Sequence, residues 1–392
     1  MESKMTEKIY YEDVTLRTFA AHVLSCEAKD GKYLITLDRT AFFPEGGGQL
    51  ADIGVLGTVN VLDVKERGGV IFHTVDKPIP AGSPVMGGIN WTRRFRHMQQ
   101  HTGEHIVSGI ANRLFGADNV GFHMGDEYLT VDWDVQLSME QLKTVEQLAN
   151  EAVYRNIPVS AEFPAPEQLA EICYRSKKEL TGPVRIVTIP GYDVCACCGT
   201  HVPFTGEIGA IKLTGAQNYK GGTRIFLACG AQAMDDYVEK QQGVASVSSL
   251  LSAKPAEISQ AVKRLLQENE ELKRKLAAAH GTLLEMKVSS VPEGCGNVCA
   301  IENSFGSDDL RRYALSLSKR CGGTAAVFSG EDGIYRYAVS NFHSDVRPEG
   351  KALNKALSGR GGGSRELVQG SVKAVRSDIE KFFRVSSLIL SE

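Results

Sequence analysis

Long apolar runs are missing from this sequence. No stretch reaches the about 18 residues that a membrane-spanning helix needs. The polar N-terminus, MESKMTEKIYYEDVTLR, also lacks the apolar segment of a signal peptide. We therefore expect a cytoplasmic protein that has no membrane partner.

A strong charge of one sign is also missing. The formal net charge of −3 excludes a basic field over the whole molecule, so a nucleic-acid partner would have to bind local patches. The nine cysteines are odd in number and irregular in spacing, which argues against a disulfide framework. Three of them crowd together at Cys195, Cys197 and Cys198, a pattern typical of metal or thiol chemistry.

The length of 392 residues exceeds what one hydrophobic core usually spans, so we expect several domains. Residues 1–90 contain short alternating runs broken by Gly and Pro, which predicts a small β-barrel. Residues 91–242 mix helical and strand patterns, and residues 290–392 do so again as an α/β globular domain. Between them, residues 243–289 read as a helical or coiled-coil segment. The predicted fold class is α+β.

Apolar periodicity predicts helices at residues 98–114, 139–154, 309–319 and 377–384. Ser138 is the expected N-cap of the second helix. Strands are expected at residues 129–133 and 185–189, and the glycine-rich run at residues 358–364 is expected to be a flexible turn.

A heptad repeat occupies residues 255–287. One seam consists of Val262, Asn269, Leu276 and Leu283, and the other of Ile258, Leu265, Leu272, Ala279 and Met286. The pattern fits a dimerising coiled coil, which would make a homodimer through residues 255–392. It fits a long helix packed on its own chain equally well.

Two residue pairs indicate a zinc site. His101 and His105 are four residues apart, so on a helix they share one face and can reach one ion. Cys197 and His201 have the same spacing in a compact loop, and thiolate and imidazole are both good zinc ligands. These four residues predict one zinc ion per chain, with Cys195 and Cys198 as alternative thiolates. The helical spacing predicts that Glu104 points away from the ligand face.

These motifs resemble the editing domain of alanyl-tRNA synthetase. The resemblance rests on residues 96–105, on the Cys-Cys-Gly-Thr-His run at 197–201, on the glycine-rich segment 40–49, and on residues 208–225. It covers roughly residues 10–235, and Cys198 departs from it where glycine is usual. The C-terminal unit weakly resembles that synthetase's C-terminal domain. Only about 90 residues precede the zinc region, too few for an aminoacylation core, so we expect a free-standing trans-editing protein of the AlaX group, in its long form.

The resemblance implies a deacylase that hydrolyses the ester of serine, or of glycine, on alanine tRNA. Zinc would polarise the carbonyl and activate water. The residues implied at the substrate are Gln49, Thr40, Gly47 and Gly48, with Thr40 expected to bond a serine hydroxyl. The residues implied at the tRNA are Arg93, Arg94, Lys220 and Arg224, with Arg360 and Arg365 in the C-terminal unit. Asp193 could orient a ligand histidine, but a turn residue is the favoured interpretation.

Two other functions fit the same residues. In one, the zinc is structural and the chain is a tRNA-binding module without hydrolytic activity. In the other, the chain is a zinc peptidase or amidase, which the absence of a general-base glutamate beside the histidine pair disfavours.

Overall fold

The computed structural model describes the chain except for residues 1–4, 126–128, 177–181, 304, 385–387 and 392. The chain divides into two compact units, Met1–Ser246 and Val247–Glu392, and each combines helices with sheets. The predicted α+β class is confirmed, whereas the finer domain boundaries stay a prediction. Among the described residues, no helix is both long and apolar enough to cross a bilayer.

The first unit begins with a closed six-stranded antiparallel sheet, in the order β2-β3-β7-β6-β5-β8. Its strands are β2 (Thr18–Lys29), β3 (Lys32–Leu37), β5 (Gly54–Leu56), β6 (Val59–Arg67), β7 (Val70–Val75) and β8 (Pro84–Ile89). In β2, buried Phe19, Ala21 and Val23 alternate with exposed neighbours, because successive strand side chains point to opposite faces. The sheet lies where the small β-barrel was predicted. Beside it, β1 (Glu7–Lys8) and β4 (Arg39–Thr40) pair in parallel, and a short helical turn covers Ile9–Tyr11.

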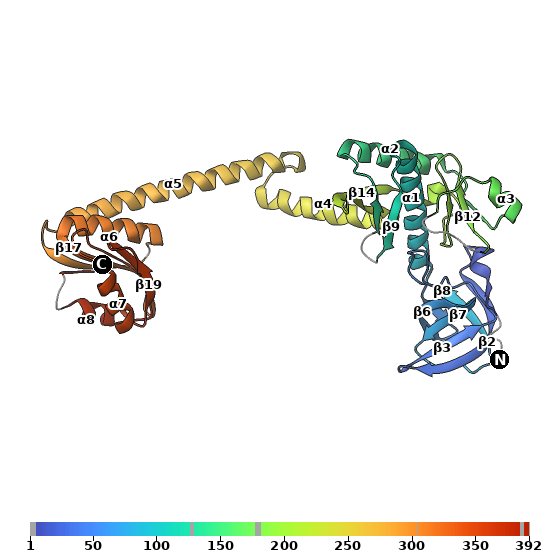
Figure 1. The fold of residues 1–392 in the computed structure, drawn as a ribbon, viewed down its shortest axis with the longest axis horizontal. Helices are drawn as coiled ribbons and strands as arrows, with labels where there is room; N and C mark the ends of the chain where they lie inside the picture. Colours follow the sequence, from blue (N-terminus) through green and yellow to red (C-terminus); the bar gives the residue numbers. More distant parts are fainter. Residues whose placement is uncertain (1–4, 126–128, 177–181, 304, 385–387, 392) are drawn as a thin grey trace. The chain divides into compact units, whose positions relative to one another are not determined.

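Helix α1 (Trp91–Phe115) leads from the closed sheet into the rest of the first unit (Figure 1). The Asn90 side chain caps it by accepting a hydrogen bond from the Arg93 amide at 3.1 Å, and Gly116 ends it in the left-handed conformation at φ 64°. Every residue from 97 to 111 is buried, the polar ones included. A helix enclosed on all sides must satisfy its polar groups inside the protein. This buried polar segment is therefore a candidate for a functional site.

The rest of the first unit contains two further sheets and several helices. One sheet has the order β14-β15-β10-β9 and the other β11-β12-β13. The strands are β9 (Asn119–Met124), β10 (Leu129–Trp133), β11 (Ser160–Glu162), β12 (Ile186–Ile189), β13 (Asp193–Ala196), β14 (Ile211–Tyr219) and β15 (Gly222–Cys229). The helices are α2 (Met139–Arg155) and α3 (Pro166–Glu171), with a helical turn at Thr205–Ile208. Helix α4 (Ala231–Leu251) begins in this unit and crosses its boundary at Ser246. Ser138 caps α2 in a capping box with Gln141, as predicted for that residue.

Two glycines in α1 are there for packing. A Cβ at Gly103 would overlap the Cys229 sulfur, and one at Gly109 would overlap the Tyr192 carbonyl oxygen. Glycine lowers helix propensity, but here it lets α1 lie directly against β15 and the start of β13. This close approach brings the polar face of α1 to the loop that follows β13.

The second unit is built on a six-stranded sheet in the order β19-β20-β18-β17-β16-β21. Its strands are β16 (Gly296–Glu302), β17 (Gly322–Glu331), β18 (Ile334–Ser340), β19 (Arg360–Gly363), β20 (Leu367–Val372) and β21 (Leu388–Ser391). Its helices are α5 (Ile258–Ser290), which follows a helical turn at Pro255–Glu257, α6 (Ser307–Cys321), α7 (Arg347–Ala356) and α8 (Arg376–Phe383). Buried residues such as Val298, Leu317 and Val327 join α6 to the sheet in one core.

The glycine-rich run of the second unit was predicted as a flexible turn, and this prediction is wrong. Residues 360–363 form edge strand β19, which pairs antiparallel with β20 from Arg360↔Ser371 to Gly363↔Val368. Backbone groups alone make a ladder, so glycine can join one when the neighbouring strand lies very close. A Cβ at Gly361 would overlap the Gln369 carbonyl oxygen.

The heptad residues of α5 are mostly exposed. Leu265, Leu272 and Leu276 are 53%, 63% and 57% exposed, so the described residues of this unit do not cover the seams. Only near its C-terminal end does α5 pack on α6, where Leu284 is buried. The choice between a coiled-coil dimer and packing on the same chain stays open.

Candidate metal centre

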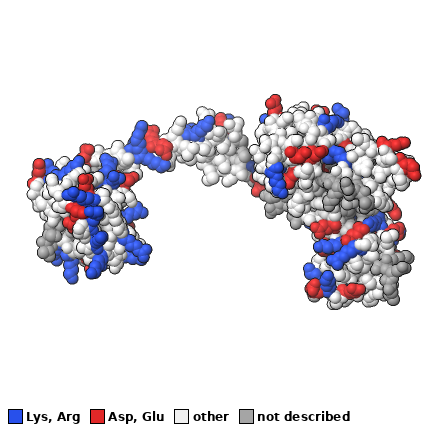
Figure 2. All heavy atoms as spheres, viewed as in Figure 1, with Lys and Arg blue, Asp and Glu red and all other residues white. Residues whose placement is uncertain are grey.

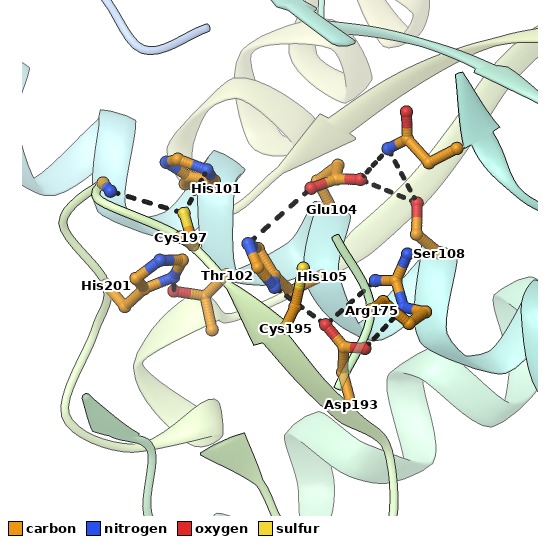
Figure 3. Close-up of polar contacts among 12 residues, drawn as sticks. His101, Thr102, Glu104, His105, Ser108, Arg175, Asp193, Cys195, Cys197 and His201 are labelled. Atoms are coloured by element: carbon orange, nitrogen blue, oxygen red, sulfur yellow. Dashed lines mark hydrogen bonds and ion pairs between the residues drawn. The ribbon is translucent and has the colours of Figure 1, made fainter. Parts of the chain in front are cut away.

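Helix α1 and the loop after β13 bring four potential ligands together (Figure 3). His101 and His105 lie one helical turn apart, with ring centroids 5.4 Å from each other. Cys197 follows β13, and its amide donates a hydrogen bond to the Arg185 carbonyl at 3.0 Å, which anchors the loop. The ligand atoms of His101, His105, Cys197 and His201 all lie within 4.8 Å of one another, and all four residues are largely or fully buried.

A hydrogen bond fixes each of the three imidazole rings through its Nδ1 atom. His101 Nδ1 lies 2.9 Å from Gln49 Oε1, His105 Nδ1 lies 2.8 Å from Asp193 Oδ2, and His201 Nδ1 lies 3.3 Å from Thr102 Oγ1. The first two partners only accept hydrogen bonds. The Thr102 hydroxyl already donates to the Met98 carbonyl, so it accepts as well. Each ring therefore carries its proton on Nδ1 and presents the Nε2 lone pair to the centre.

The centre still has unused ligand capacity. Among the described residues, His201 Nε2 is buried and has no hydrogen-bond partner. The Cys197 sulfur lies 3.4 Å from His101 Nε2 and accepts the Gly199 amide at 3.3 Å. A buried nitrogen lone pair without a partner is costly, and three imidazoles with one thiolate match the ligand chemistry of zinc. The residues present fit a zinc ion.

The titration behaviour agrees with a metal site. Burial opposes ionisation of Cys197, yet the imidazoles of His101 and His105 hold the pKa of its thiol well below the ordinary value. Burial lowers the pKa of His201 to about 3, so this ring stays neutral. Burial also opposes protonation of His105, but Cys197 and Asp193 raise its pKa well above the ordinary value. Metal ligation needs a thiolate and neutral imidazoles, so a bound metal would displace any proton held on His105 Nε2 or on the Cys197 sulfur.

Asp193 belongs to the outer layer of this centre, so the favoured interpretation as a turn residue is wrong. It lies in β13, and its carboxylate accepts from His105 and from the Arg175 guanidinium at 2.8 and 3.0 Å. Carboxylates in this place fix the orientation of a ligand histidine. Cys195, the neighbouring thiol, forms a second possible ligand group with His105 and Asp193. Because Asp193 is already held by Arg175 and His105, we assign that group to the outer layer.

The glycine-rich segment reaches the centre with its two glycines at a cavity and its glutamine at a ligand histidine. Gly47 and Gly48 have φ angles of 60° and 83° and line a cavity of about 730 Å³ beside His101 and His105. Gln49 is fully buried, and both ends of its side-chain amide are hydrogen-bonded. Its Oε1 lies 2.9 Å from His101 Nδ1 and accepts the Thr200 amide at 3.1 Å, and its Nε2 donates to the Thr200 hydroxyl at 2.8 Å. Gln49 was expected to contact the substrate, but its hydrogen bond fixes the orientation of the His101 ring instead.

Thr40 lies away from the cavity. It is fully buried in the first unit, where its hydroxyl is 2.9 Å from His73 Nε2 and accepts the Phe42 amide at 3.1 Å. It is not among the residues that line the cavity. The expected contact between Thr40 and a serine hydroxyl has no geometric basis in this structure.

Glu104 was predicted to point away from the ligand face, and this prediction is wrong. Its carboxylate lines the cavity, with Oε2 at 4.0 Å from His105 Nε2 (Figure 3). Oε1 accepts the Ser108 hydroxyl at 2.7 Å and the Asn119 amide. The cavity therefore borders Glu104 as well as the two ligand histidines of α1. The spacing of four residues between Glu104 and Ser108 is the sequence feature that could have indicated their hydrogen bond.

The residues predicted at the tRNA are dispersed. Arg94 has no exposed surface, because its guanidinium pairs with Asp52 and donates to the Ala41 carbonyl, so it cannot reach a phosphate. Arg93 is half-buried. Arg224 pairs with Asp132 at 2.5 and 2.7 Å, and Lys220 next to it is exposed.

In the second unit, Arg360 and Arg365 are exposed on and beside β19. On the faces drawn in Figure 2, basic and acidic side chains are interspersed. Contact between these residues and a tRNA stays a prediction.

Comparison with known proteins agrees with the geometry. Residues 184–226, which include Cys197 and His201, match the family described as "Threonyl and Alanyl tRNA synthetase second additional domain". An alanine–tRNA ligase from Pyrococcus abyssi is 33% identical over 98% of this chain and 44% of its own length. Alanine–tRNA ligases from Pyrococcus furiosus and Pyrobaculum neutrophilum are also 33% identical, over 96% and 94% of this chain. The chain thus spans less than half the length of these relatives.

A solved C-Ala domain of Aquifex aeolicus alanyl-tRNA synthetase aligns with 25% of this chain and 99% of that domain, at 18% identity and a TM-score of 0.22. At that score the likeness does not establish the fold of the aligned part.

Proposed function

Because the chain is an AlaX-like relative of alanyl-tRNA synthetases, we propose that it hydrolyses the ester of serine or glycine on mischarged alanine tRNA. One observation carries this proposal. Three imidazole nitrogens and a thiol converge beside a cavity of about 730 Å³ that His101, His105 and Cys197 line, and a hydrogen bond at Nδ1 orients each ring. Such a preorganised centre beside an open cavity suits the hydrolysis of a bound ester.

We assign the cofactor as one zinc ion, held by His101, His105, Cys197 and His201. When bound, zinc supplies a Lewis acid that polarises a carbonyl oxygen and lowers the pKa of a bound water. Gln49, Asp193 and Thr102 keep the three rings in the tautomer that binds metal.

The other lining residues fit the remaining parts of an aminoacyl ester. Its α-ammonium group is cationic, and we assign Glu104 to accept hydrogen bonds from it, because this buried carboxylate is among the residues that line the cavity. Gly47 and Gly48 lack side chains, so the backbone there can approach the sugar closely. Tyr11, Phe122 and Phe163 give the cavity apolar walls.

The second candidate is a tRNA-binding module whose zinc is structural. It is favoured by the count of four protein ligands, because a complete tetrahedron leaves no open position for water. Both candidates predict bound zinc, so only turnover separates them.

The proposed partner in either case is alanine tRNA. Exposed Lys220, Arg360 and Arg365, and half-buried Arg93, are the remaining candidates for phosphate contacts, with Arg224 available only if it leaves Asp132. We also propose that the exposed seam of α5 mediates a homodimer through residues 255–392, and that the chain acts in the cytoplasm.

The test is deacylation of seryl-, glycyl- and alanyl-tRNA(Ala) by the purified zinc-loaded chain. We expect release of serine or glycine, little release of alanine, and loss of both zinc and activity in His101→Ala. His123→Ala is the matched control, because His123 is an exposed histidine of β9 outside the centre. Failure of the zinc-loaded chain to release any of the three amino acids would leave the binding module as the better proposal.

A further inference from the structure

Arg185 is a buried cation at the cavity that the proposed chemistry does not use. It precedes β12, lines the cavity and is only 7% exposed. Its Nη1 donates to the carbonyls of Cys197 at 3.1 Å and Gly199 at 2.8 Å. Within the described part of the chain, its Nε is buried without a hydrogen-bond partner and no carboxylate forms an ion pair with it.

Two other arginines of this unit, the buried Arg94 and the partly buried Arg175, are neutralised by carboxylates. Arg94 pairs with Asp52, and Arg175 pairs with Asp193. A buried charge without a counter-ion is strongly unfavourable. Arg185 instead lies against an aromatic face, with its Cζ 4.8 Å from the centre of the Tyr11 ring. This contact leaves its charge available for an anion that enters the cavity.

The chemistry of the substrate limits what that anion can be, and here the inference rests on the proposed function. In an aminoacyl ester the carboxylate is consumed by the ester bond, and the α-amino group is cationic. The negative charge closest to the ester in the chain of bonds is the phosphodiester on the 5′ side of the terminal nucleoside. Arginine is well suited to phosphate because its planar fork donates two parallel hydrogen bonds.

An aromatic wall stands next to Arg185. The Tyr11 hydroxyl donates to the Cys198 carbonyl at 3.1 Å, which holds the ring at the ligand loop. Phe163 packs edge-on against Tyr11 with ring centroids 5.5 Å apart, and it is 50% exposed and among the residues that line the cavity. Unpaired bases of nucleic acids stack on such rings.

We propose that Arg185 is a positioning residue that binds the last phosphodiester of the tRNA acceptor end, with Tyr11 and Phe163 forming the wall for the terminal base. The anchor fixes the terminal nucleotide so that its ester lies at the centre. Arg185 also donates to the Cys197 carbonyl, so it links the bound phosphate to the loop that carries a ligand.

The kinetic test compares two small substrates that differ by one phosphodiester, the 3′-seryl esters of adenosine and of cytidylyl-(3′→5′)-adenosine. The zinc-loaded chain is expected to favour the dinucleotide in kcat/KM by about tenfold to a hundredfold, through a lower KM, as for a charged hydrogen bond. Arg185→Gln should bring the ratio of the two kcat/KM values close to one, whatever rate the nucleoside ester itself retains, because only the dinucleotide loses a phosphate contact. The control is Arg67→Gln, an exposed arginine of β6 outside the cavity.

A binding test needs no turnover. Calorimetry with adenosine 5′-monophosphate and with adenosine should show tighter binding of the monophosphate to the wild-type chain, and Arg185→Gln should abolish the difference. Zinc content and melting temperature of the variant report any damage to the loop. Equal binding of the two probes by the wild-type chain overturns the proposal without any variant, and so does an equal loss of rate on both esters in Arg185→Gln. A preference for the monophosphate in a chain that hydrolyses no ester would reject the proposed function and keep this site.

Discussion

Replacement of Asp193 by asparagine tests whether the hydrogen bond behind a ligand sets the metal affinity of the centre. Asp193 is 6% exposed and accepts from His105 Nδ1 at 2.8 Å. Asparagine keeps the volume and one carbonyl oxygen but loses the negative charge. The hydrogen bond to His105 can survive, while the charge that makes the imidazole more basic and holds Arg175 is lost.

The magnitude follows from this geometry. Loss of an outer partner of a metal ligand costs about 10-fold to 100-fold in metal affinity, which corresponds to about 1.4–2.7 kcal/mol. The lost ion pair adds less to the folding energy than a fully buried pair would, because the Arg175 side chain is 21% exposed. At a fixed zinc concentration that saturates both proteins, zinc-dependent stabilisation should fall by the same 1.4–2.7 kcal/mol or so.

The assay is a competition titration of zinc against a chelator, together with denaturant unfolding with and without zinc. The matched control is Asp132→Asn. Asp132 also makes a two-bond ion pair, with Arg224 at 2.5 and 2.7 Å, but touches no ligand of the centre. The Asp132→Asn substitution should lower the free energy of unfolding without changing the zinc affinity. Wild-type zinc affinity in Asp193→Asn would refute the reasoning.

Three further predictions follow from burial and packing. Zinc binding should strengthen as pH rises above neutrality and should release protons, because the pKa of His105 is raised in the metal-free chain and its proton must leave; calorimetry in buffers of different ionisation enthalpy would detect the protons. Burial lowers the pKa of His73 to about 4, so its neutral form stabilises the fold above about pH 6.5, and up to about 3 kcal/mol is lost as pH falls toward 4. His73→Gln should flatten this part of the curve of unfolding free energy against pH, and an unchanged slope would contradict the assignment. Gly103→Ala should destabilise the fold by about 1–3 kcal/mol despite its better helix propensity, because the added Cβ would overlap Cys229; a raised melting temperature would contradict the packing argument.

Local patterns were the reliable part of the sequence. The helices α1, α2 and α5 overlap the segments whose apolar periodicity predicts them, and Ser138 caps α2. Capping and apolar periodicity depend on residues a few positions apart, so a single sequence is enough to predict them. Strand β19 was missed because three of its four residues are glycine, and only the neighbouring strand β20 makes it a strand.

The sequence by itself determined the kinds of ligand atoms in the candidate metal centre, because imidazole and thiol side chains recur at a spacing of four. Only the tertiary structure decided what surrounds them. It turned Glu104 toward the cavity, placed Gln49 and Asp193 behind the ligand histidines, and left Thr40 away from the site. These contacts join segments far apart in the chain, such as His101 and Cys197 at a separation of 96 residues. Such pairings depend on how the closed sheet, α1 and the ligand loop pack together, and no local pattern encodes that packing.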